Sequence, residues 1–119
     1  MSLLSNLFFL SCHRKHQYRG NREGIELFVS SDTEAWDRTV GYDTEAYCFG
    51  TNILFRSDEE YNDPTVWKHE REHVRQMLAC GGEGVFRPAY LLSSMIAKMR
   101  WGDPTRNRFE REAHAAEKL

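Results

Sequence analysis

The sequence has few cysteines and lacks a long apolar run. Its three cysteines, Cys12, Cys48 and Cys80, lie far apart in a chain of 119 residues, so they predict neither a disulfide framework nor a cysteine-based zinc site. We therefore expect reduced thiols in a cytoplasmic protein. The apolar residues 3–10 are too few to span a bilayer, and no basic segment precedes them as it would in a secretory signal.

The sequence also lacks a strong excess of charge of either sign. Sixteen Lys and Arg against eighteen Asp and Glu give a net charge of -2, and there is no polybasic run, so a nucleic acid partner is not expected. Aromatic residues at 13% and charged residues at 29% are typical of a folded, soluble domain. The length suits one domain, and nothing in the sequence indicates an oligomeric state.

We divide the chain into an N-terminal segment, residues 1–24, and a domain, residues 25–119. The segment is either flexible or docked on the domain. Its residues 11–24 are polar and basic and contain two glycines, which is typical of a loop or linker. The residues before Cys12 resemble a bacterial lipoprotein cleavage site, so lipid attachment there is the alternative to a cytoplasmic location.

The first half of the domain predicts a small antiparallel sheet. Apolar runs predict strands at residues 25–29, 46–50 and 52–55, and the last two form a hairpin around a glycine turn. Residues 33–38 predict a short helical turn, and the acidic residues 57–62 predict a loop. The candidate buried residues of the hairpin are Tyr47, Phe49, Ile53 and Phe55.

The second half of the domain predicts three helices, which makes the fold class α+β. Asp63 is a good N-cap for a helix over residues 64–80, which a glycine pair ends. A second helix covers residues 88–101. Asn107, with Glu110 three residues later, resembles a capping pair before the last helix.

The first of these helices contains the pattern His-Glu-x-x-His at His69, Glu70 and His73. Two histidines four apart on a helix lie one turn above each other, so both imidazoles can bind the same zinc ion. At about 100° per residue, the three motif residues share a half of the helix with the apolar Val66 and Val74. A buried carboxylate at Glu70 is costly unless a cation faces it, and we expect it to be the general base of a metal-activated water.

A catalytic zinc site of this kind needs a third protein ligand and an open position for water. The last helix offers Glu110, Glu112 and His114. Periodicity does not choose between the two glutamates, because they flank the apolar face on opposite sides. His114 lies on the same side as Glu110, four residues later, where it could steady that ligand or serve as a further one.

The layout resembles the gluzincin peptidases, in which His-Glu-x-x-His is followed on a later helix by a glutamate ligand within Glu-x-x-Ala. The run from Glu110 to Ala113 fits that pattern, so the resemblance implies Glu110 as the third zinc ligand. Many gluzincins have an aspartate four residues after this ligand, where this chain has His114. The family is expected to bring a minimal zincin-like fold and hydrolysis of peptide bonds.

Residues 41–53, together with the helix that carries His69, also resemble the minimal metallopeptidase-like domains associated with extracellular contractile injection systems. That resemblance implies a strand pair beside the active-site helix, whose edge receives an extended peptide or protein substrate. Tyr90 and Tyr42 are candidate donors to the oxyanion, with packing as the alternative, and Gln76 could support a ligand unless it is half exposed.

The sequence thus favours a zinc metallopeptidase. The alternative is a catalytically silent, metal-stabilised module that binds partners within a larger assembly. A fourth protein ligand, such as His114 or Cys80, would favour the module, and an open water position would favour the enzyme.

Overall fold

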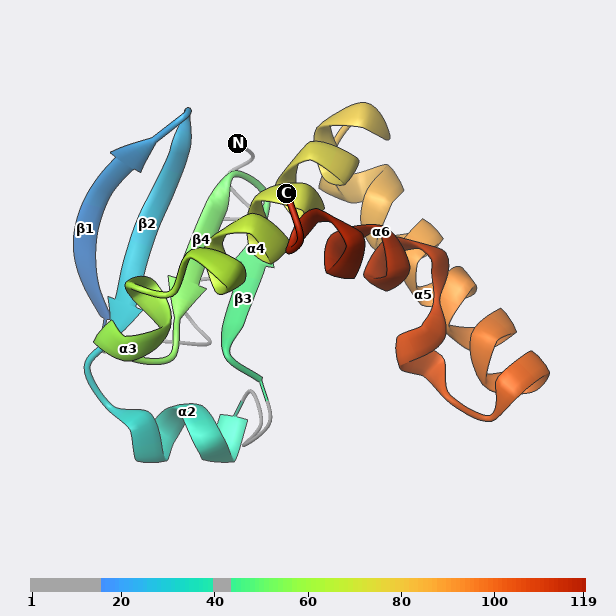
Figure 1. The fold of residues 1–119 in the computed structure, drawn as a ribbon, viewed down its shortest axis with the longest axis horizontal. Helices are drawn as coiled ribbons and strands as arrows, with labels where there is room; N and C mark the ends of the chain where they lie inside the picture. Colours follow the sequence, from blue (N-terminus) through green and yellow to red (C-terminus); the bar gives the residue numbers. More distant parts are fainter. Residues whose placement is uncertain (1–15, 40–43) are drawn as a thin grey trace.

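A four-stranded mixed sheet forms one side of the molecule in the computed structural model, which describes residues 16–39 and 44–119 (Figure 1). The strand order is β1-β2-β4-β3, with β1 at His16–Arg22, β2 at Ile25–Ser30, β3 at Ala46–Phe49 and β4 at Asn52–Phe55. The α+β class is confirmed.

The sheet has one strand more than the small antiparallel sheet expected from the sequence, and it is mixed rather than antiparallel. β1–β2 and β3–β4 are antiparallel pairs, whereas β2 and β4 are parallel. The parallel pair arises because helix α2, Thr33–Thr39, carries the chain past the sheet before β3 begins. β4 then returns beside β2 in the same direction, and β3 becomes an edge strand.

The loop predicted for residues 11–24 is wrong where the structure describes it. His16–Arg22 is strand β1, joined to β2 by a two-residue turn in which Glu23 and Gly24 both have positive φ, 55° and 82°. The polar sequence of β1 did not predict a strand, because an edge strand that is mostly exposed does not need alternating apolar residues. Residues 1–15, with the apolar run and Cys12, lie outside the described residues.

The two faces of the sheet bury different residues. One face packs against α4 (Pro64–Ala79) through alternate residues of the strands: Ile25, Leu27, Val29, Ala46, Cys48, Ile53 and Phe55. On the other face, Trp36 of α2 and Leu54 are fully buried. Ile53 and Phe55 were predicted correctly. Tyr47 and Phe49 are only partly buried, because their register in β3 turns them toward Trp36 rather than the main core.

The helices follow their capping signals. Asp63 accepts a hydrogen bond from Thr65 N at the start of α4, as expected. α5 spans Glu83–Trp101 and begins five residues before the predicted start at Pro88, because Phe86 extends its buried face by a turn. The acidic loop is instead a short helix, α3, at Asp58–Tyr61.

Asn107 fixes the start of the last helix, α6 (Arg108–Ala116), which follows the 3₁₀ turn η1 (Pro104–Arg106). Its Oδ1 accepts from Glu110 N at 2.9 Å, and its Nδ2 donates to Ser94 Oγ of α5 and to Pro104 O, each at 3.0 Å. The side chain is 1% exposed, so it joins α6 to α5 inside the protein. No helix of the described residues has both the length and the apolarity of a membrane span.

Candidate metal centre

His69, His73 and Glu110 form a group that could hold a metal ion. The two imidazoles come from adjacent turns of α4, and Glu110 comes from the first turn of α6, which packs against α4. The Nε2 atoms of His69 and His73 lie 3.2 Å apart. The Glu110 carboxylate places Oε2 at 3.1 Å from His69 Nε2 and Oε1 at 3.0 Å from His73 Nε2.

These separations are close to those between ligand atoms in a tetrahedral metal site, with the two histidines approaching different oxygens of Glu110. For ligand bonds of about 2.0–2.1 Å to zinc, the ligand atoms of a tetrahedron lie about 3.3 Å from one another. The three side chains here approach one another at 3.0–3.2 Å. Two imidazole nitrogens and a carboxylate oxygen are also a donor set that zinc accepts. The residues present therefore fit a single cation between them.

Gln76 orients His73 for such a role. Its Oε1 lies 3.0 Å from His73 Nδ1 and its Nε2 donates to Phe109 O at 3.0 Å and to Glu112 Oε2 at 3.1 Å. A carboxamide oxygen can only accept, so Nδ1 of His73 carries a proton, and Nε2 is the nitrogen that could give up its own proton and bind a metal. Gln76 is 3% exposed, so the prediction of a half-exposed side chain is wrong. Its contacts fit the other prediction, that it supports a ligand.

Tyr90 of α5 steadies the carboxylate. Its hydroxyl donates to Glu110 Oε1 at 2.8 Å. Burial and the neighbouring charge of Glu110 raise the pKa of Tyr90 far above neutrality, so it stays a donor. Burial would raise the pKa of Glu110, but its hydrogen bonds with His69, His73 and Tyr90 hold that pKa well below its ordinary value. Glu110 is therefore ionised, as a ligand must be.

The group sits in a negative environment. Burial lowers the pKa of His69 and His73, but hydrogen bonds to Glu110 and the charge of Glu70 more than offset it, so both pKa values are raised. Glu70 is 8% exposed, and burial raises its pKa above the ordinary value. The same carboxylates that favour protonated imidazoles would stabilise a cation placed between them.

Glu117 was missed by the sequence reasoning. Its Oε2 lies 3.0 Å from His114 Nδ1 and its Oε1 lies 3.4 Å from His69 Nδ1, a buried nitrogen without a well-aligned hydrogen bond among the described residues. The structure thus places His114 beside His69, with ring centroids 4.8 Å apart. The spacing of 110, 114 and 117 along one helical face was the signal that could have found Glu117.

A cavity of about 730 Å³ opens beside the group. His69, Glu70, His73, Tyr90 and Glu110 line one part of it. Residues 44–48, which include most of edge strand β3, line another. The group that could hold a metal therefore faces a hollow large enough for several residues of an extended peptide. Tyr42, the other candidate oxyanion donor, lies outside the described residues.

Comparison of the chain with protein-family models, with curated proteins and with solved structures gave no match.

Proposed function

We propose that the protein is a zinc-dependent peptidase of the gluzincin type, with His69, His73 and Glu110 as the metal ligands. The observation that carries the proposal is the convergence of three candidate ligand side chains, with closest approaches of 3.0–3.2 Å, beside a buried glutamate and an open cavity. Zinc in this position would polarise the scissile carbonyl and lower the pKa of its water to about 7.

Glu70 is the general base in this proposal. It follows His69 directly on α4 and faces the same cavity. Its raised pKa makes it a better proton acceptor near neutral pH than an ordinary carboxylate. Glu70 takes a proton from the attacking water and gives it to the leaving amine. Tyr90 and Gln76 position Glu110 and His73 through the hydrogen bonds described above.

The substrate class follows from the strand beside the cavity. Among the described residues β3 pairs with β4 on one side only, so part of its outer edge can accept the main chain of an extended peptide, although the Cys48 carbonyl there already accepts from Arg87 at 3.0 Å. Ala46 and Cys48 line the cavity from this strand. A peptide added along it would bring one of its carbonyls toward the metal group. We therefore propose an unstructured peptide or protein segment as the substrate.

The coordination number separates the enzyme from a silent metal-stabilised module. Among residues 16–39 and 44–119, the group of His69, His73 and Glu110 gains no fourth histidine, cysteine or carboxylate. His114 instead belongs to a second cluster with Glu117 and the other side of His69. Structural zinc sites are usually closed by four protein ligands, and three ligands leave room for water. The observed set favours catalysis.

The purified full-length chain should contain one zinc ion per molecule. Elemental analysis after exhaustive dialysis measures this, and a cleavage assay on an unstructured protein measures activity. Removing the metal with a chelator should abolish cleavage, and adding zinc should restore it. A metal-free protein would refute both the enzyme and the metal-stabilised module. A zinc-loaded protein that cleaves nothing would leave only the module.

Changing Gln76 to Leu should weaken zinc binding by about 10–100-fold, because His73 loses the group that fixes its proton on Nδ1. Competition with a chromophoric chelator measures the affinity. Gln17→Leu is the matched control, since Gln17 is an exposed glutamine on β1. Equal affinities in the two variants would show that Gln76 does not support the site.

A further inference from the structure

α5 exposes an apolar stripe that the proposed chemistry does not use. Seven large apolar or proline side chains recur along one side of this helix: Val85, Pro88, Leu91, Leu92, Met95, Ile96 and Met99. At about 100° per residue they span roughly 140° of the helix, opposite Phe86 and Ala97, which are buried. The exposed fractions reach 62% at Met95 and 84% at Met99. The stripe is roughly 21 Å long.

Basic side chains border the C-terminal end of this stripe. By helical position, Lys98 and Arg100 lie on its two sides. At the last residue of α5, on the side of the helix away from the stripe, the guanidinium groups of Arg100, Arg106 and Arg111 stand over the ring of Trp101, 5.1–5.8 Å from its centre. All four basic residues are exposed. This end of α5 and the η1 turn project away from the sheet, as Figure 1 shows.

The charge identifies the class of partner. α5 has a single acidic residue, Glu83, which bonds to Gly50 N and to Arg87 and so faces away from the stripe. If the α5 helix of a second copy packed on this stripe, basic side chains would face basic side chains, because α5 has no exposed acidic residue to pair with them. Nucleic acid would satisfy the arginines but not cover the apolar stripe. An apolar surface fringed by anions complements both features, and anionic lipid headgroups over acyl chains have this arrangement.

We propose that α5 lies in the interface of an anionic membrane, with Leu92, Met95 and Met99 in the acyl region. Lys98 and Arg100 then reach the headgroups, as long basic side chains do at helix flanks. The contact is peripheral and separate from the metal centre, whose ligands lie on α4 and α6. The cavity that carries the metal group stays open to substrate beside it.

Flotation of the full-length protein with lipid vesicles tests the proposal. We expect binding to vesicles of phosphatidylcholine mixed with phosphatidylglycerol, and little binding to phosphatidylcholine alone. High salt should weaken the binding. Met95→Ser with Met99→Ser should reduce it by at least about tenfold, and Arg100→Glu by roughly tenfold.

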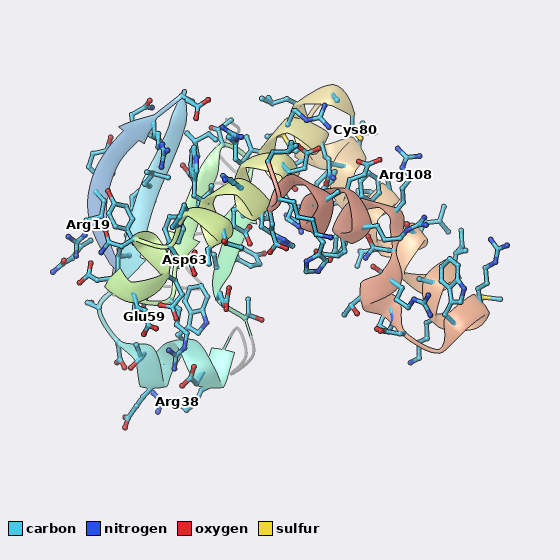
Figure 2. The ribbon with its side chains drawn as sticks, in the orientation of Figure 1. Arg19, Arg38, Glu59, Asp63, Cys80 and Arg108 are labelled. Atoms are coloured by element: carbon cyan, nitrogen blue, oxygen red, sulfur yellow. The ribbon has the colours of Figure 1, made fainter. Side chains whose placement is uncertain are left out.

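Matched controls come from residues of similar exposure away from α5. Leu119→Ser removes an apolar side chain that is 86% exposed, and Arg38→Glu reverses a charge on α2, at the opposite end of the molecule from α5 in Figure 2. Both variants should bind as the wild type does.

Three outcomes would overturn the proposal. Absence of binding to either vesicle would assign the stripe to a protein partner. Equal binding to neutral and anionic vesicles would remove the role of the arginines. A dimer in solution that the paired methionine substitutions abolish would assign the stripe to a second copy. None of these results depends on whether the protein binds zinc or cleaves peptides.

Discussion

Changing Glu70 to Gln should lower the rate of peptide cleavage by about 10²–10⁴-fold while zinc stays bound. The substitution keeps the size of the side chain and removes its ability to accept a proton. Glu70 follows a ligand directly and lines the cavity, so its loss acts on the chemical step rather than on the fold. Single-turnover cleavage of an unstructured protein, with zinc content measured on the same samples, separates the two effects.

Glu72→Gln is the control for this experiment. Glu72 belongs to the same motif and the same helix, but its carboxylate accepts from Arg75 Nε at 2.9 Å on the outer side of α4. Removing its charge should leave cleavage within about twofold, because Glu72 pairs with the exposed Arg75 and does not line the cavity. If Glu70→Gln and Glu72→Gln cleaved at the same rate, Glu70 would not be the base and the mechanism would be wrong.

Changing Glu110 to Gln should abolish stoichiometric zinc binding and, with it, cleavage. The carboxylate is the only charged member of the ligand group, and its oxygens lie 3.0–3.1 Å from the two imidazole nitrogens. A neutral carboxamide is a poorer zinc ligand and would present an NH₂ group to one of the histidines. Elemental analysis after dialysis measures the ratio of metal to protein.

The comparison with Glu112→Gln decides between the two glutamates that periodicity left open. Glu112 is exposed and accepts from Gln76 Nε2 at 3.1 Å, so it lies behind His73 rather than on the metal group. Its substitution should retain the zinc and weaken binding only slightly. Loss of zinc in Glu112→Gln with retention in Glu110→Gln would reverse the assignment and require another arrangement of α6.

Local signals in the sequence were enough to predict where α4 and α6 begin, whereas the expectation that they share a metal site came from the family resemblance. The Asp63 and Asn107 caps can be predicted from two or three neighbouring residues. The four-residue spacing places His69 and His73 on the same side of α4 however that helix packs. The sheet was harder. β1 carries almost no apolar signal, and the parallel pairing of β2 with β4 depends on a contact between residues that are far apart in the chain.

Gln76 and Glu117 were also hard to predict, because their positions depend on contacts between helices. Gln76 was expected to be half exposed, because the sequence of one helix says nothing of the neighbouring helix that covers it. Its burial comes from α6, whose Phe109 carbonyl accepts from it. Glu117 escaped notice because a surface glutamate near a chain end is ordinary until His69 and His114 are seen beside it.

The hydrogen bonds of Asn107 also influence how firmly the last helix is held. Because this side chain fastens α6 to α5 and accepts from the amide of Glu110, the position of this candidate ligand depends on both helices and not on α6 alone. A metal ion bound by α4 and α6 would cross-link two segments separated by the 36 residues between His73 and Glu110. Metal binding would therefore also stabilise the packing of α6 against α4. Catalytic competence and the stability of that packing would then rise and fall together.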